Sequence, residues 1–245
     1  LRLLAVAVML TVAALTAVGF FADRLNSGLA RDARQLLGGD AIVGSDKPPA
    51  AELLTKAQAL KLKVARNVSF PSMGRAPDDK GGASRLVAVK AVSGNYPLRG
   101  QLQLKASPEA PVQTVAAAPE RGTVWVDAAV LDSLQLKMGD PLLLGDLSLK
   151  IARIIVIEPD RGAGFMNFAP RAMLHEDDLD ATGLVQPASR VNYRLAVAAP
   201  EGGEAAVREF VRWADERIKT APLRGVRVES LESGRPEMQQ TLERA

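Results

Sequence analysis

The N-terminal stretch constrains this chain more than any other feature. Leu3 to Ala22 are twenty consecutive positions without a charged side chain, and Asp23-Arg24 ends the run. A helix of that length spans about 30 Å, the thickness of a bilayer's hydrocarbon core, and is too long for a buried core helix. A cleaved signal peptide, cut after Ala17-Val18-Gly19, is the alternative, but its apolar region would be shorter. We predict a retained transmembrane helix over residues 1–22.

The region after this run continues the helical pattern. Apolar side chains recur at steps of three and four, and Gly38-Gly39 then provide a C-cap. The pattern predicts a helical stalk over residues 23–39 that continues the membrane helix and packs one stripe on the following domain; an ordinary surface helix after a short break is the alternative. The stripe consists of Leu25, Leu29, Ala33, Leu36 and Leu37.

Composition excludes several classes of function. The 31 Lys and Arg residues nearly balance 28 Asp and Glu residues, which does not suit binding to nucleic-acid phosphates. Cysteine is absent and His175 is the single histidine, so thiolate catalysis and metal sites built on cysteines or several histidines are excluded. We predict no catalytic residue, no cofactor, no metal and no nucleic-acid partner.

Strand-helix-strand patterns occur at both ends of the remaining sequence. We therefore expect an α+β fold, with a ferredoxin-like split βαβ sandwich formed by residues 40–99 and 188–235. Residues 71–84, rich in Gly, Pro and Asp, are expected to form a loop. The expected strands are Ala41–Ser45, Lys63–Phe70, Arg85–Val92, Arg190–Ala198 and Gly225–Leu231, and the expected helices are Ala50–Leu62, Glu204–Thr220 and a start at Pro236–Ala245 that leads toward a further membrane span.

Residues 100–187 have a different character, with short strands separated by Gly-Asp turns. We predict an inserted β-rich subdomain whose strands form a sheet separate from that of the flanking segments. The expected elements are a strand at Thr123–Val126, a helix at Ala128–Leu134 capped by Asp127, a strand at Pro141–Leu144 and a long strand at Leu147–Glu158 with a register change near Arg153.

Several segments resemble one family of membrane proteins. ADRLNSGLARDARQLLGGDAIV, SGNYPLRG, EPDRGAGFMNFAPR and the stretch from Val124 to Ile155 are similar to the YbbP-like branch of MacB/FtsX-type ABC-transporter permeases. The resemblance covers nearly the whole chain. It implies a porter-like α/β subdomain with an inserted β-rich subdomain, placed between the first membrane helix and the second.

The resemblance also implies partners and a location. It places the protein in the bacterial inner membrane, in contact with the lipid bilayer, with residues 23–245 on the periplasmic side. It implies a separate cytoplasmic ATP-binding subunit and a second permease copy or a homologous permease. The chain begins at Leu1 and not at Met, so we expect it to be part of a longer protein. No glycine is followed by lysine, so the chain lacks a P-loop, and ATP hydrolysis is expected on the partner.

Two short motifs join an arginine to a rigid bend. Tyr96-Pro97-Leu98-Arg99-Gly100 and Pro159-Asp160-Arg161-Gly162 could be hinges of the chain or contacts with a partner. The apolar residues Phe165, Met166 and Phe168 could contact an apolar cargo or pack in the core. The candidate interface or cargo-contact residues are therefore Tyr96, Arg99, Arg161, Phe165, Met166 and Phe168.

An acidic cluster runs from His175 to Asp180. Asp178, Asp180, Thr182 and Gly183 match the first half of a calcium loop, but Ser189 stands where a bidentate Glu is required. We interpret the cluster as a solvated turn. Without a G-x-S-x-G motif, His175 also lacks a recognisable serine partner for hydrolysis.

Two candidate functions are consistent with the sequence and with the resemblance. The first is an extracytoplasmic domain of a permease that handles a hydrophobic or lipid-linked cargo and transmits movement driven by ATP hydrolysis elsewhere. The second is a scaffold or signalling domain that recruits or activates a periplasmic enzyme. A cleft lined by long apolar side chains would favour the first function, and a flat charged docking face would favour the second.

Overall fold

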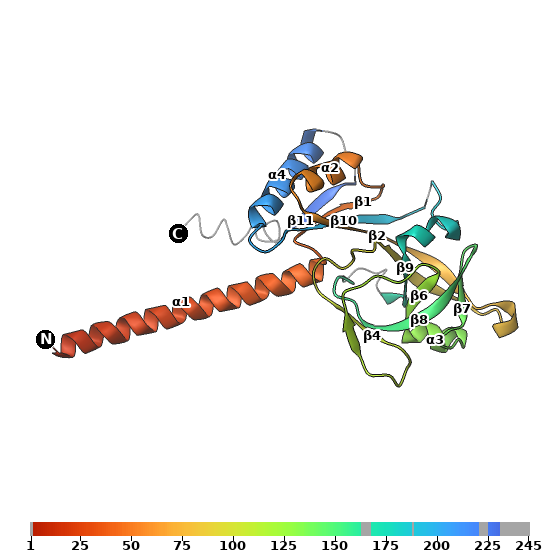
Figure 1. The fold of residues 1–245 in the computed structure, drawn as a ribbon, viewed down its shortest axis with the longest axis horizontal. Helices are drawn as coiled ribbons and strands as arrows, with labels where there is room; N and C mark the ends of the chain where they lie inside the picture. Colours follow the sequence, from red (N-terminus) through yellow and green to blue (C-terminus); the bar gives the residue numbers. More distant parts are fainter. Residues whose placement is uncertain (1, 163–167, 188, 221–224, 231–245) are drawn as a thin grey trace.

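The computed structural model describes residues 2–162, 168–187, 189–220 and 225–230. It has a mixed α+β architecture, as expected, with a long N-terminal helix that leaves a sheet-rich body (Figure 1). The helices are α1 (Arg2–Leu37), α2 (Ala51–Ala59), α3 (Ala128–Leu134) and α4 (Glu204–Thr220), with 3-10 turns η1 (Asp78–Lys80), η3 (Glu176–Asp178) and η4 (Asp180–Thr182). The strands are β1 (Ala41–Ser45), β2 (Lys63–Arg75), β3 (Ser84–Val92), β4 (Leu102–Lys105), β5 (Gln113–Val115), β6 (Thr123–Asp127), β7 (Pro141–Leu144), β8 (Leu147–Ile157), β9 (Arg171–His175), β10 (Asn192–Ala198) and β11 (Arg227–Ser230).

Helix α1 is one unbroken helix of 36 residues where the sequence predicts a membrane span followed by a stalk. Within the part of the chain that the structure describes, no helix reaches the length and hydropathy expected of a membrane span. The expectation that the stalk stripe packs on the domain is wrong. Leu25, Leu29 and Leu36 are 54%, 55% and 68% exposed, because α1 points away from the body and meets it at its C-terminal end (Figure 1).

One end of the sheet is built from the two flanking segments. Its strand order is β11-β1-β10-β2, and each neighbouring pair is antiparallel. Helices α2 and α4 cover one face of it (Figure 1). The core between the helices and this face is formed by Ala41, Val43, Leu53, Ala57, Leu62, Leu195, Val197, Ala199, Val207, Phe210 and Ala214.

The sheet does not stop where the flanking segments end. Strand β3 pairs in parallel with β9, and the end of β2 pairs with β7, so strands of residues 100–187 join the same hydrogen-bonded sheet. The expectation of two separate sheets is therefore wrong. The reason is that β2 is thirteen residues long and spans both parts: its first half pairs with β10 and its second half reaches β7.

The second core lies in the β-rich part, but it also draws on the flanking segments. Phe70 of β2 and Val87 and Val89 of β3 are buried there together with residues of β6, α3, β7 and β8. Residues 100–187 therefore share a core with the β2–β3 hairpin and do not enclose one alone.

The stretch expected to be a loop, residues 71–84, is largely a hairpin. Strand β2 continues through Pro71 to Arg75, and Ser84 already pairs with Arg75. The pairing of β2 with β10 ends at Ser69, and its pairing with β7 begins at Gly74. Between these positions, β3 is the single described strand that pairs with β2, so Pro71 is tolerated at an edge position. The turn is confined to residues 76–83.

Other elements lie close to their predicted positions. β1, α3, β7 and α4 have the predicted bounds, and the predicted register change near Arg153 is confirmed, because Ile151 and Arg153 pair with neighbouring residues of β6. The helix expected at Pro236–Ala245 lies outside the described residues. Strands β4, β5 and β9 were not predicted, because each is only three to five residues long.

Candidate functional site

The two bend motifs meet at a network of buried charges. Lys90 of β3 donates hydrogen bonds from Nζ to Tyr96 Oη (3.0 Å), Glu158 Oε1 (2.7 Å) and Asp160 Oδ1 (2.8 Å). Arg171 of β9 donates from Nε to Glu158 Oε2 (2.7 Å). We call these five residues the buried network; each is at most 6% exposed. It contains two cations and two carboxylates, so its formal charges cancel.

The surroundings of the network shift the pKa values of Glu158 and Tyr96. Burial by itself raises the pKa of Glu158, but the charges of Lys90 and Arg171 and their hydrogen bonds outweigh it and lower the pKa to about 2. Burial raises the pKa of Tyr96 well above its usual value, and the charges of Asp160 and Glu158 add to the effect. Tyr96 therefore remains a neutral donor, and its hydroxyl donates to Asp160 Oδ1.

Arg99, the arginine of the first motif, holds the end of α1 to the sheet. It donates from Nε to Asp40 Oδ1 (2.8 Å) and from Nη2 to Asp40 Oδ2 (2.7 Å), and Nη2 also donates to the carbonyl oxygen of Ala199 (2.6 Å). Asp40 Oδ2 in turn accepts a hydrogen bond from Ala199 N (2.9 Å). This bidentate arrangement joins the turn after α1, the bend motif and the end of β10.

Arg161, the arginine of the second motif, makes a matching contact with Asp127. Its Nη1 and Nη2 donate to the two carboxylate oxygens of Asp127 at 3.2 and 2.7 Å. Asp127 Oδ2 also accepts from Arg171 N (2.8 Å). The predicted helix-capping role of Asp127 is wrong: among the described residues its carboxylate bonds no backbone N–H of α3 and serves Arg161 instead.

Two glycines allow the three segments to approach closely. Gly38, at the end of α1, has φ +73°, and a Cβ there would lie 3.1 Å from the side chain of Asp160. Gly100 has φ +80°, and a Cβ there would lie 2.8 Å from Pro159 Cβ. Positive φ and lack of space both favour glycine. The C-terminal end of α1 and the two bend motifs therefore pack together, and we call this region the junction.

The structure brings together only part of the predicted site. Tyr96, Arg99 and Arg161 belong to the junction, and Tyr96 is buried and not exposed as an interface residue. Phe168 is 83% exposed, although the carbonyl oxygen of the adjacent Ala169 accepts a hydrogen bond from Arg161 (3.3 Å). Phe165 and Met166 lie outside the described residues.

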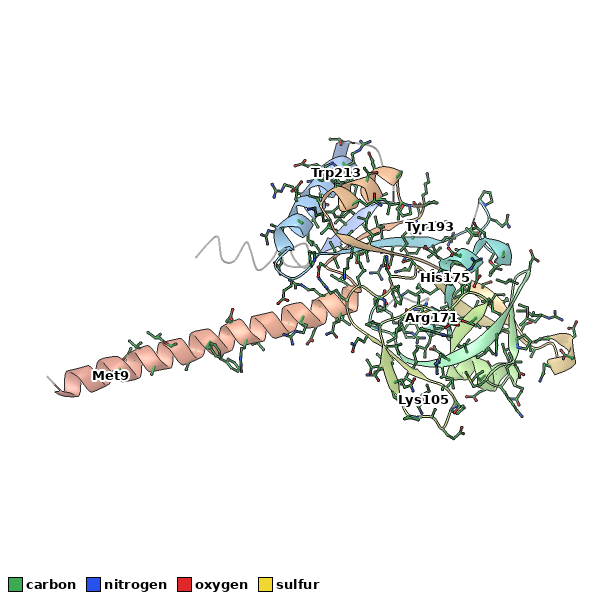
Figure 2. All side chains as sticks on the ribbon, viewed as in Figure 1. Met9, Lys105, Arg171, His175, Tyr193 and Trp213 are labelled. Atoms are coloured by element: carbon green, nitrogen blue, oxygen red, sulfur yellow. The ribbon has the colours of Figure 1, made fainter. Side chains whose placement is uncertain are left out.

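Sequence reasoning missed several members of the junction. Lys90, Arg171, Asp40 and Asp127 were not proposed as site residues. Lys90 had a visible signal, because it is the single charge within the apolar stretch LVAVKAV of β3. Arg171 lies nine residues after Gly162, at the end of the segment EPDRGAGFMNFAPR; Figure 2 shows it within the body, and it belongs to the same strand as His175.

The acidic cluster near His175 is built as a turn. Asp178 is buried and accepts a hydrogen bond from Gly122 N (2.7 Å), and Glu176 pairs with Arg66 (2.7 Å). Among the described residues, no group of three or more His, Asp or Glu side chains is placed to hold a metal ion.

Comparison with known proteins identifies a relative. The chain is 33% identical over 213 residues to the uncharacterized ABC transporter permease YbbP of Escherichia coli (strain K12). This chain is a relative of an ABC transporter permease. The resemblance expected from the motifs is thereby confirmed. The match covers 87% of this chain and 25% of the relative, so the chain spans about a quarter of that permease.

Other comparisons add less. No protein-family model matches the chain. The crystal structure of the periplasmic region of MacB from Actinobacillus actinomycetemcomitans aligns over 86% of this chain and 96% of its own, with a TM-score of 0.48 and 9% sequence identity.

Proposed function

We propose that this chain is the membrane-anchored extracytoplasmic domain of an ABC transporter permease. The observation that carries the proposal is the 33% identity to a named permease over 87% of the chain. The position of the junction, where a long helix enters a sheet-rich body, fits a domain that receives movement from the membrane.

The proposed role is mechanical coupling. A separate cytoplasmic subunit hydrolyses ATP, α1 carries the resulting movement, and the junction passes it into the sheet. The junction suits this role because segments of both parts of the body lie against the turn after α1: Asp40 is bound by Arg99, and the backbone of Gly38 lies close to the side chain of Asp160. Buried ion pairs resist separation because a lone buried charge is costly.

The cargo and the partners are part of the same proposal. The cargo is hydrophobic or lipid-linked, and the exposed ring of Phe168 is a candidate contact for it. A second permease copy or a homologous permease completes the transporter. Residues 1–22 anchor the chain in the bilayer of the bacterial inner membrane, and residues 23–245 lie on the periplasmic side.

The observed hydrophobic cores change where we propose to divide the chain into subdomains. The order β11-β1-β10-β2, with α2 and α4 on one face, supports a ferredoxin-like split unit from residues 40–99 and 188–235. However, Phe70, Val87 and Val89 pack with residues 100–187. We therefore propose that the β2–β3 hairpin end belongs with the inserted unit, and that excising residues 100–187 alone exposes this apolar face.

Spin labels on the full-length permease, assembled with its ATP-binding subunit in nanodiscs, test the proposal. The 245 residues contain no cysteine, so once any cysteines elsewhere in the assembly are replaced, cysteines introduced at exposed Leu29 and Met73, singly or together, report from this domain. We expect the distance between Leu29 labels in two copies to change between the ATP-bound and nucleotide-free states, while the Leu29–Met73 distance within one copy stays constant. Failure to retain an ATP-binding subunit, or a Leu29–Leu29 distance between copies that does not depend on nucleotide, would contradict the proposal.

A further inference from the structure

Strand β5 forms one end of the sheet. It pairs with β4, and among the described strands β4 is its single partner, so its other edge presents backbone N–H and C=O groups to solvent. Proteins commonly protect such edges with charged side chains. Here the ten residues from Ala110 to Pro119 carry no charge at all.

A cleft lies on each face of this edge. On one face, Ile157, Gln103 and Thr114 form a row of cross-strand neighbours along β8, β4 and β5. That row lines a cleft of about 840 Å³, whose wall includes Gln35 and Leu36 of α1. The cleft thus lies between the sheet edge and the C-terminal end of α1.

The opposite face has a smaller cleft. Gln113 and Val115 of β5 line it together with Leu104, Trp125 and Arg153, and its volume is about 320 Å³. Because successive residues of a strand point to opposite faces, a strand added beside β5 would direct alternate side chains toward the two clefts.

We propose that the β5 edge binds an extended segment of a second protein by strand addition. The backbone of the segment would pair with Gln113–Val115, at the usual strand spacing of about 4.8 Å. Its alternate side chains on the α1 side are large and apolar, because Leu36 and Ile157 line that cleft. Three charged groups line this cleft: Arg99 is bound by Asp40, and Glu158 by Lys90 and Arg171, whereas Asp32 adds a carboxylate at the α1 side. An acidic side chain of the segment would be repelled there, so the segment carries none on this face.

A second copy of β5 fits the same place less well. Self-pairing would present Thr114 and Ala116 to the larger cleft, and such small side chains would leave most of its volume of about 840 Å³ unfilled. The partner is therefore a different polypeptide. This inference is independent of the proposed coupling role and of the nature of the cargo.

A peptide selection tests the proposal on the full-length permease in nanodiscs. The probes are synthetic decapeptides selected from a displayed random library. We expect bound peptides to slow amide hydrogen exchange at Gln113–Val115, and N-methylation of alternate peptide amides to weaken binding by about tenfold or more. The N-methylated peptides test strand pairing on the unmodified protein, so this result does not depend on any variant folding.

Two variants locate the binding. Thr114→Pro and Thr114→Lys are both expected to abolish binding of the selected peptides, whereas Met73→Lys, on the exposed side of the β2–β3 hairpin, leaves it unchanged. Three results overturn the proposal: no selected peptide protects Gln113–Val115, N-methylation has no effect, or exchange at Gln113–Val115 in the free protein slows with protein concentration, which assigns the edge to a second copy. A loss of nucleotide-dependent movement with peptide binding intact would instead contradict the coupling role alone.

Discussion

The junction contains two kinds of charged contact that differ in burial. The buried network around Lys90 and Glu158 is shielded from water, whereas the side chains of Arg99 and Arg161 in the two arginine–aspartate pairs are 34% and 30% exposed. Both kinds use bidentate or multiple hydrogen bonds between full charges. Water can partly replace a lost partner at the arginine pairs but not in the network. Loss of one charged partner should therefore destabilise the protein more in the buried network than at the two arginine–aspartate pairs.

The largest effect is expected from removing the central cation. Lys90→Met leaves two buried carboxylates with Arg171 as the remaining cation of the network, and we expect the free energy of unfolding to fall by about 3–5 kcal/mol. Denaturant unfolding of the protein measures this change. Lys150→Met, on an exposed residue of β8, is the matched control and should change stability by less than about 0.5 kcal/mol. Equal effects of the two substitutions would refute the importance of burial.

Charge balance can be tested by a second substitution. Asp160→Asn combined with Lys90→Met removes one charge of each sign from the network. We expect the double variant to lose less stability than the sum of the single losses, because fewer unpaired charges remain. Denaturant unfolding of the four proteins in the cycle gives the coupling energy, and simple additivity would argue against a coupled network.

The network should also give the domain a specific dependence on acid. The folded protein lowers the pKa of Glu158 from 4.5 to about 2, so its stabilisation is present above about pH 5 and is lost as the pH falls toward 2. The shift corresponds to about 3 kcal/mol. The stability difference between the protein and Glu158→Gln should therefore shrink over that range. Glu201→Gln, at an exposed position, should show no such trend; a constant difference for Glu158→Gln would contradict the assignment.

A smaller effect is expected at the arginine pairs. Arg99→Ala should lower the free energy of unfolding by about 1–2 kcal/mol, because water reaches the half-exposed guanidinium site and partly solvates Asp40. Hydrogen exchange at the Ala199 amide, which donates to Asp40, should accelerate. Arg99→Lys should restore little of this, because an ammonium group cannot make the bidentate contact. An effect as large as that of Lys90→Met would remove the distinction between the two kinds of contact.

The sequence identifies both bend motifs and most of the elements that carry them. Helix α4 and strand β1 follow from residue spacing alone, because hydrophobic periodicity is a local property. The missed strands β4, β5 and β9 are three to five residues long, and their assignment depends on partners far along the chain. The continuous sheet was missed for the same reason, since it depends on the pairing of β3 with β9 and of β2 with β7.

What the sequence by itself determined is the long N-terminal helix, the alternating elements at both ends of the domain and the positions of the two arginine bends. Only the tertiary structure decided what these bends contact. Lys90 and Asp160 are separated by 70 residues, and Arg99 and Asp40 by 59. Local spacing determines which face of an element a side chain occupies, but the opposing charge that makes its burial tolerable is brought to it by the packing of distant strands.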